Sequence, residues 1–488
     1  MKRRWNVEAS ERFAVSTRVI VVVLLLLAAT FRAGYLRSAP RGMQFDHVDA
    51  RGYHWLAINL LSARSFSMDP DPPLRPDYVR APLYPLFVAL WYAVSGPSPD
   101  FVVFTHVLVE VLTVAVVFRF GKTVADERVG KVAALLYALS PSSWRFCNEL
   151  LTEILFGLLL TVSVWMFARH ILSGRNRDAL ACGIAFGFAI LCKPNVQFLP
   201  LALLAIMAHG VRAGRRRWWR GAAIVGATIA VMLVPWVVRN RVVFGKWFYT
   251  RTFDDNLAHV SAVATLAEVR GERVAPWTPR WEELYDEVVV RTALRYGWST
   301  TGDRELSARQ RDRRLQQAKA VALEILREHP VDFVVSHTRA WLWAFVPQEH
   351  RFWYARLTGE DWASLPTEGD ALGRALRVLR AGDVGAAARI LIQDRLLALP
   401  PLALVLWLGW GVLYAIAAAL FAIGALRLRP RVLAVFIGLT IVYVTFVPGP
   451  ISQIRFRLPV TPQILTLVAV GALGLNSRSN HVNPQPRR

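Results

Sequence analysis

Four acidic residues have types and positions suited to proton-transfer chemistry. Asp46 and Asp49 lie in the segment QFDHVDARGYHW, and Glu149 and Glu153 lie in FCNELLTEILF. Each segment adjoins a long apolar block, and a carboxylate at a membrane surface is costly unless it is paired. Glu149 and Glu153 would share one helix face if a single helix carried both. Two such carboxylates facing a basic cluster would suit acid/base work on a phosphate-bearing substrate; an ordinary surface carboxylate is the alternative for each.

Several basic residues lie where the charge bias of membrane proteins does not place them. Positive residues concentrate in cytoplasmic loops, yet six adjoin predicted outer membrane ends: Arg80, Lys193, Arg239, Arg241, Arg455 and Arg457. The planar fork of Arg donates two parallel bonds to phosphate. As a set, these residues indicate an anionic ligand at the outer leaflet, although any one could instead extend toward lipid headgroups.

The elements that position these residues are apolar blocks. The chain has 488 residues, of which 54% are hydrophobic and 19% are charged. The apolar residues come in blocks of roughly the 20 residues that a transmembrane helix needs. A single soluble domain, a disordered chain and a secreted disulfide scaffold are therefore excluded. The net charge of +23 is spread over short clusters between the blocks, as in a membrane protein, so we expect no nucleic-acid partner.

The blocks and the inner basic loops predict an all-α polytopic membrane protein with about 10 transmembrane helices and both ends inside. The predicted spans are residues 18–36, 100–118, 132–148, 154–171, two short spans within 179–208, 221–238, 400–426, 432–447 and 459–475. A single span over 179–208 is the alternative, but it would place five arginines outside. We therefore favour a hairpin that turns at Lys193–Pro194.

The topology divides the chain into four parts. Residues 1–238 form a transmembrane catalytic module with its first outer loop at 37–99, 239–395 form a mainly helical extracytoplasmic region, 396–475 form the C-terminal helices, and 476–488 form a cytoplasmic tail. In the first outer loop, Leu83–Val94 is too short to span a membrane and predicts an interfacial helix. In the outer region, Ala308–His329 predicts a helix that ends before proline. The Trp-rich run Phe333–Val346 predicts a second helix, either at the membrane surface or in a soluble core.

A set of motifs resembles the type C glycosyltransferases, polytopic enzymes that use polyprenyl-phosphate-linked sugars. The motifs are DARGYHWLA after the first span, RAPLYP at the interfacial helix, LTEILF, LCKP, PWVVRN followed by FG, and RFRLPV before the last span. Bacterial protein O-mannosyltransferases and the aminoarabinose transferase that acts on lipid A belong to this group. The resemblance covers most of residues 15–250 and returns at 440–475.

The resemblance implies roles for the matching residues. Asp49 matches the acidic residue that acts as catalytic base or positions the acceptor, because Tyr53 follows at the family spacing. Asp46 is a neighbour without that spacing, and Glu153 matches a second carboxylate that assists the acceptor or a metal better than Glu149 does. The implied substrate-binding set is Asp46, Tyr53, Arg80, Tyr84, Lys193, Arg239, Asn240, Arg455 and Arg457, of which Arg80, Lys193, Arg455 and Arg457 would bind the lipid phosphate.

Two departures from the family pattern leave a metal undecided. The first loop has one motif Asp in place of an Asp-Glu pair, and Arg80 stands where the aminoarabinose relative has an acidic residue. We therefore expect no certain cofactor and leave a divalent metal open. The proposed role of Asp49 carries a condition. Asp49 can serve as the catalytic base if burial raises the pKa of its carboxyl group toward the working pH.

The expected function is transfer of a sugar from a polyprenyl-phosphate donor to a hydroxyl acceptor at the outer face of the cytoplasmic membrane. The partners are then the lipid donor, membrane lipid and an acceptor that the sequence does not identify. A lipid-linked glycan polymerase or ligase is the main alternative. A transporter is a weaker one, because it would show repeated halves, and no internal repeat is evident.

Overall fold

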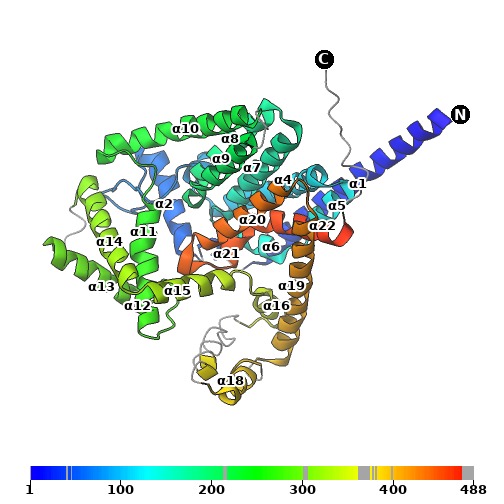
Figure 1. The fold of residues 1–488 in the computed structure, drawn as a ribbon. Helices are drawn as coiled ribbons and strands as arrows, with labels where there is room; N and C mark the ends of the chain where they lie inside the picture. The colour runs from blue at the N-terminus through cyan, green and yellow to red at the C-terminus, as the bar shows by residue number, and fades with distance from the viewer. Residues whose placement is uncertain are drawn as a thin grey trace.

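The fold is described from a computed structural model. The described residues are 2–39, 42–45, 47–212, 217–299, 306–360, 374–375, 378–379, 382–396 and 399–474. Within them every regular element is a helix, which confirms the predicted all-α class. A bundle of long helices forms the body, a group of shorter helices lies against one side of it, and α1 projects from the opposite side (Figure 1).

The first half of the chain supplies most of the bundle. Its elements are α1 (Lys2–Ser38), η1 (Met43–Phe45), α2 (Val48–Ala63), α3 (Leu83–Ser95), α4 (Pro99–Val124), α5 (Glu127–Ala138), α6 (Pro141–Cys147), α7 (Glu153–Ser173), α8 (Asn176–Cys192), η2 (Pro194–Val196), α9 (Leu199–Arg212) and α10 (Arg217–Phe244). α3 is the short helix expected in the first outer loop. It packs against α2, so that loop is a helical pair.

Six helices among the described residues are long and apolar enough to cross a membrane: Thr17–Ser38, Pro99–Val124, Glu153–Ser173, Trp218–Phe244, Pro401–Arg427 and Ile454–Leu473. They coincide with six of the ten predicted spans and make this a multi-pass membrane protein. The remaining predicted spans, at 132–148, 179–208 and 432–447, correspond to helices of fewer than 18 residues.

The short segments differ from the predicted spans for local reasons. The span predicted at 132–148 is wrong as one helix, because the chain is extended at Ser140 and Pro141 begins a new helix. The break predicted at Lys193–Pro194 is confirmed, since α8 ends at Cys192 and Lys193 has an extended backbone. A residue before proline is biased toward this conformation.

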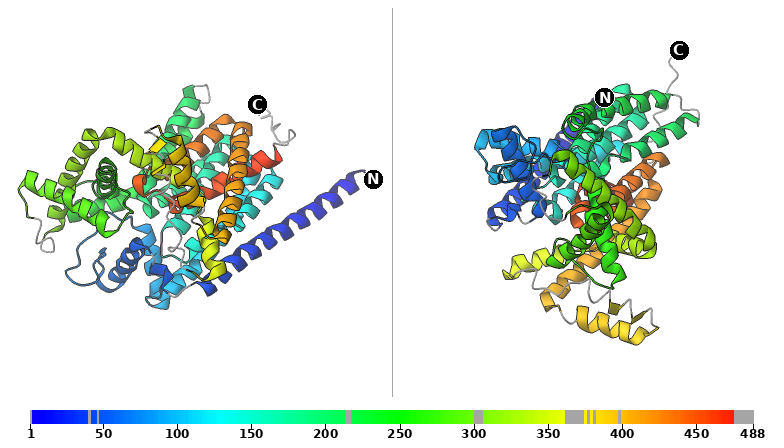
Figure 2. Two further views of the ribbon diagram at one scale, coloured as in Figure 1. Left: turned by 90° about the horizontal axis from the view of Figure 1, so that it is seen from below. Right: turned by 90° about the vertical axis from the view of Figure 1, so that its left-hand side faces the viewer.

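The helices of the outer region lie beside the bundle (Figure 2), and those over residues 257–326 share an apolar core of their own. Its elements are α11 (Thr252–Asp255), η3 (Asn256–Ser261), α12 (Ala262–Val269), α13 (Pro279–Tyr296), α14 (Ala308–Glu328), α15 (Pro330–Trp343), α16 (Glu349–Thr358), α18 (Val384–Ile390) and η6 (Leu391–Leu396). The helix predicted at 308–329 is α14, which begins with a capping box between Ser307 and Gln310. The Trp-rich helix is α15. The division of the chain into four parts stays a prediction.

The C-terminal elements carry the last of the sequence motifs, RFRLPV, at residues 455–460. They are α19 (Pro401–Arg427), α20 (Arg431–Phe446), η7 (Gly449–Ile451), α21 (Ile454–Arg457), η8 (Leu458–Val460) and α22 (Thr461–Leu473). α19 and α22 cross at Gly424 and Gly471, where a Cβ atom would lie 1.9 Å from a carbonyl oxygen of the other helix. Glycine permits this close approach, which anchors α22 and so helps to place α21.

A buried ion pair joins the first helices of the bundle. Arg32 is 0% and Glu110 is 1% exposed, and Arg32 Nη2 lies 2.8 Å from Glu110 Oε2. Ser143 and Tyr137 complete the polar contacts, with the Ser143 hydroxyl 2.6 Å from Arg32 Nη2 and the Tyr137 hydroxyl donating to Glu110 Oε1 at 2.8 Å. Both charged groups are hydrogen-bonded within the protein, so we interpret the pair as structural.

We expect Glu110→Gln to lower the free energy of unfolding by about 3–5 kcal/mol, because it leaves the Arg32 charge buried without compensation. The matched control is Glu127→Gln, which removes a carboxylate from partly exposed pairs with Lys122 and Lys131 and should cost less than about 1 kcal/mol. Unfolding in detergent, followed by thermal melting, measures both. Equal and small losses would contradict the structural role of the pair.

Candidate active site

Two carboxylates and three cationic side chains meet at one end of the bundle helices. We call Arg80, Asp49, Arg455, Glu153 and Lys193 the ion-pair cluster. Arg80 Nη2 lies 2.5 Å from Asp49 Oδ1, and Arg455 Nη2 lies 2.8 Å from Asp49 Oδ2. Arg455 Nε and Lys193 Nζ both donate to Glu153 Oε1, the latter at 2.6 Å. The charges alternate from Arg80 to Lys193 and leave one positive charge in excess.

The ion-pair cluster opens to solvent at one end. The side chains of Arg80 and Asp49 are 27% and 17% exposed, whereas those of Arg455, Lys193 and Glu153 are 7%, 10% and 0% exposed. A ligand that approaches from solvent therefore meets Arg80 and Asp49 first.

Helix ends position both carboxylates. Asp49 lies in the first turn of α2, and Glu153 is the first residue of α7. The partial positive charge of a helix N-terminus favours a carboxylate at such positions. Arg455 comes from the short helix α21, and Lys193 lies at the break between α8 and η2. The site thus draws on segments far apart in the sequence.

Asp49 is held ionised by its neighbours. Burial acts to raise its pKa, but Arg80, Arg455 and His47 together lower it well below the ordinary value. Asp49 in turn raises the pKa of Arg80. The condition set from the sequence, a base whose pKa is raised by burial, is therefore not met by Asp49 while both guanidinium groups contact it.

His47 caps α2 and adds a neutral group to the site. Its Nδ1 accepts the Asp49 N–H at 3.2 Å, and its ring faces Arg455 Nη1, with Nε2 at 2.7 Å. Burial and the charge of Arg455 lower the pKa of His47 from 6.5 to about 4. The neutral imidazole has one acceptor nitrogen and one N–H. Because Nδ1 accepts the Asp49 N–H, Nδ1 is also the nitrogen that can accept from Arg455 Nη1, which lies 3.1 Å away.

This pKa shift predicts a pH dependence of stability. Between 6.5 and about 4 the unfolded chain binds a proton at His47 and the folded chain does not, so the free energy of unfolding falls as the pH drops through that window. His47→Gln keeps an acceptor for Arg455 and should flatten this part of the profile. Thermal melts of the two proteins across the window measure the difference; identical slopes would contradict the shifted pKa.

Two tyrosines predicted to bind substrate support the exposed end of the ion-pair cluster. The Arg80 guanidinium lies 5.6 Å from the Tyr53 ring centroid, and the Tyr53 ring meets Tyr84 edge-on at 4.9 Å. The Tyr84 hydroxyl lies 3.3 Å from His106 Nε2. Burial raises the pKa of Tyr53, so its phenol stays protonated beneath Arg80.

Arg239 and Asn240 lie outside the ion-pair cluster and bind backbone. Arg239 Nη1 donates to the carbonyl of Asp77 at 2.9 Å, and Asn240 Nδ2 donates to the carbonyls of Phe248 and Tyr249 at 3.1 and 2.7 Å. The Arg239 bond joins the end of α10 to the loop that leads into Arg80, and the Asn240 bonds join it to the segment that follows α10. Arg239 therefore helps to position that loop.

Arg457 belongs to a separate buried group. Its Nη2 lies 3.1 Å from Glu349 Oε1, which also accepts from the hydroxyls of Tyr414 at 2.6 Å and Ser142 at 3.0 Å. Arg457 also contacts Tyr414 directly. The two arginines of α21 therefore face different partners, and the contact with Glu349 ties α21 to α16 of the outer region.

The remaining predicted acidic residues are Asp46 and Glu149. Asp46 lies outside the described residues. Glu149 lies in the turn between α6 and α7, so no single helix carries it together with Glu153.

Sequence reasoning missed three acidic residues near the site or attached to it. Asp77, Asp255 and Glu349 come from loops and helices that carry no apolar period or family motif. Burial raises the pKa of Asp77, whose carboxylate accepts the N–H of Arg80 at 2.7 Å. The paired acids of the segment TFDDN were the available signal for Asp255.

Among the described side chains, no group of three or more His, Cys, Asp or Glu is arranged to hold a metal ion. The carboxylates of the ion-pair cluster are bonded to Arg and Lys. The described residues therefore offer no candidate set of ligands for the divalent metal that the sequence left open.

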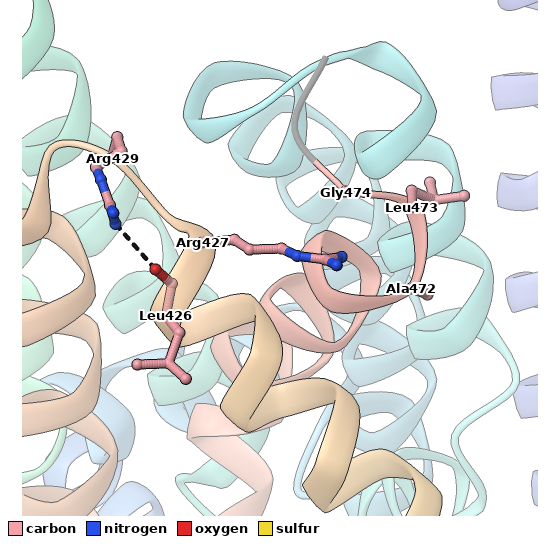
Figure 3. Close-up of a pocket in the computed structure, with 6 residues that line it drawn as sticks. All are labelled: Leu426, Arg427, Arg429, Ala472, Leu473 and Gly474. Carbon is pink, nitrogen blue, oxygen red and sulfur yellow. Dashed lines mark hydrogen bonds between the residues drawn. The ribbon is translucent and has the colours of Figure 1, made fainter. Parts of the chain in front are cut away.

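A separate hollow lies at the ends of α19 and α22. It has a volume of about 590 Å³ and is lined by Leu426, Arg427, Arg429, Ala472, Leu473 and Gly474 (Figure 3). Arg429 Nη1 donates to the carbonyl of Leu426 at 2.9 Å, and Arg427 Nη1 donates to that of Gly471 at 2.9 Å. These arginines satisfy the carbonyl groups at helix ends, and none of the ion-pair cluster lines the hollow.

A family comparison bears on the first half of the chain. Residues 79–238 match the model of a family described as dolichyl-phosphate-mannose-protein mannosyltransferase. This segment includes Arg80, Tyr84, Glu153 and Lys193. The match confirms the predicted relation to the type C glycosyltransferases and assigns the segment to a glycosyltransferase family. No curated protein matches the chain.

Two solved structures resemble the chain in fold. The Archaeoglobus fulgidus oligosaccharyltransferase in the apo form is 14% identical with a TM-score of 0.49, over 93% of this chain and 50% of that one. ArnT from Cupriavidus metallidurans bound to undecaprenyl phosphate is 14% identical with a TM-score of 0.37, over 94% of this chain and 78% of that one. The chain thus spans about half the length of the oligosaccharyltransferase.

Proposed function

We propose that this protein transfers a hexosyl or pentosyl group from a polyprenyl-phosphate-linked donor to a hydroxyl acceptor at the outer face of the cytoplasmic membrane. The observation that carries the proposal is Arg455, whose guanidinium is shared by Asp49 and Glu153 beside two further cations. A site with one positive charge in excess suits a lipid phosphate. The glycosyltransferase match over residues 79–238 supports sugar transfer as the reaction.

The donor phosphate would compete with the two carboxylates for the cations. A phosphate that enters at the exposed end meets Arg80 first and then Arg455, because these are the outermost and central cations of the cluster. Arg accepts such an exchange readily, since its fork binds carboxylate and phosphate alike. Arg457, held by Glu349, would contribute by fixing α21.

The exchange would create the base that the reaction needs. Asp49 becomes more basic when phosphate draws a guanidinium away, because the cations are what lower its pKa. Asp49 then takes the proton of the acceptor hydroxyl as the oxygen forms a bond to the anomeric carbon. The bond from that carbon to the phosphate oxygen breaks, and the polyprenyl phosphate leaves with the electron pair. Arg80, Arg455 and Lys193 stabilise the charge that develops on it.

The test offers purified protein in nanodiscs a panel of polyprenyl-phosphate monosaccharides, with donor consumption read by mass spectrometry. We expect one donor to be consumed and its polyprenyl phosphate to be released. Consumption of a pyrophosphate-linked oligosaccharide, with no monosaccharide donor turned over, would contradict the proposal and favour a glycan polymerase or ligase.

A further inference from the structure

Asp255, in the outer region, lies beside the ion-pair cluster although no motif marks it. It ends α11, and the first turn of this helix is bound to the loop that leads into the first cation of the cluster. The Arg251 N–H donates to the Tyr78 carbonyl at 2.8 Å, and the Thr252 hydroxyl donates to the Val79 carbonyl. α11 is therefore fixed to the site.

Two further observations place Asp255 at this position. α11 contacts η2, the turn that follows Lys193 directly. Asp255 also lies within electrostatic range of Arg80 and Asp49. The outer region thus brings a third carboxylate to the edge of the ion-pair cluster, outside its five members.

Asp255 differs from the other carboxylates here in its contacts. Asp49 and Glu153 each contact two cations, and the adjacent Asp254 pairs with Arg251 and Lys319 at 3.3 and 2.6 Å. Within the described part of the chain, the Asp255 side chain makes no ion pair and no hydrogen bond, and it is partly exposed. Its oxygens are free to accept a proton.

We propose that Asp255 is a second proton acceptor of this site, which receives the acceptor's proton from Asp49, directly or through water, and releases it to the outer solution. The proposal rests on the proposed glycosyl transfer. The proton balance is complete, since the proton leaves the hydroxyl, passes over the two carboxylates and enters water. Asp49 returns to its ionised form and its arginines.

The electrostatics favour transfer in this direction. Burial raises the pKa of Asp255 above its ordinary value, whereas the cations lower that of Asp49. A proton on Asp49 therefore moves downhill to Asp255, and it moves most easily as Arg80 and Arg455 return to Asp49.

The charged groups around Asp255 also act on its pKa, so they affect the interpretation of a pH profile. The titratable or charged groups on and around α11 are Arg251, Asp254, His259, Asp49, Asp77, Tyr78 and Arg80. Those of the adjoining α14 are Arg311, Asp312 and Lys319, and Lys193 precedes η2. His259 is the imidazole among these groups and interacts electrostatically with Asp255, so it needs its own control.

The experiment measures the pH dependence of donor consumption by the full protein in nanodiscs for wild type and Asp255→Asn. Wild-type turnover should fall as the pH drops through the pKa of Asp255, because the protonated acid accepts no proton. In Asp255→Asn, kcat should be about 10²-fold lower and this fall should vanish. Asp254→Asn and His259→Asn should keep it, and Asp255→Glu should restore much of kcat. An unchanged acid limb in Asp255→Asn would overturn the proposal.

A second measurement does not depend on turnover. Infrared difference spectra over a pH titration should contain the C=O band of a protonated carboxyl that titrates above the ordinary Asp range. Because burial also raises the pKa of Asp77, the spectra are taken in an Asp77→Asn background, where the band should be lost in Asp255→Asn and retained in Asp254→Asn. Its retention in Asp255→Asn would overturn the proton-acceptor role. A wild type that shows the band but consumes no donor would contradict the proposed function instead.

Discussion

Asp49→Asn is expected to lower sugar transfer by about 10³-fold or more, within the range for loss of a general base. The amide takes no proton, and it leaves Arg80 and Arg455, which contact both carboxylate oxygens, with one negative charge fewer. Donor consumption by the purified variant, measured beside wild type in nanodiscs, gives the loss.

The control for this variant is another Asp–Arg pair in the same outer loop. Asp69 contacts Arg75, accepting its backbone N–H at 2.8 Å and its side-chain Nε at 3.0 Å. Asp69→Asn removes a comparable carboxylate away from the ion-pair cluster and should leave transfer near wild type. If Asp49→Asn folds as wild type does and still transfers sugar at the wild-type rate, the base assignment is wrong.

Arg455→Lys is expected to lower kcat/KM for the donor by about 10²–10³-fold, although the charge is kept. The guanidinium spans three partners, with Nε on Glu153, Nη2 on Asp49 and Nη1 on His47. A lysine ammonium is a single point of charge and does not match this planar fork. The variant should therefore lose the geometry that lets one side chain contact the carboxylates and then the donor phosphate.

Arg457→Lys provides the matched comparison, because it is the same change in the same short helix. Its partners are Glu349 and Tyr414, so we expect a smaller loss of kcat/KM and a larger loss of thermal stability. Equal losses of kcat/KM in the two variants would indicate that the phosphate contacts both arginines, contrary to the division seen in α21.

The sequence predicted much of the site because the motifs carry its charges. Asp49, Arg80, Glu153, Lys193 and Arg455 were all selected from the residues, and they meet in one ion-pair cluster. Their charge types and their expected positions at membrane ends were enough for that. Which arginine contacts which carboxylate depends on side-chain direction, and the sequence does not contain it.

The parts that escaped prediction depend on tertiary contacts. The pairing of Arg457 with Glu349 joins residues 108 positions apart, and Asp255 reaches the site through backbone bonds to the loop at 78–79. The direction of the pKa shift of Asp49 also needed the structure, since burial alone would have raised it. The break at Pro141 was visible in the sequence, but apolar residues on both sides of it favoured one span.

The most direct test of the central claim is a structure of the nanodisc-reconstituted protein with undecaprenyl phosphate bound. We predict that the phosphate lies between Arg80 and Arg455 and that at least one guanidinium contact to Asp49 opens to receive it. A phosphate bound elsewhere, with Arg455 still held by both Asp49 and Glu153, would contradict the account.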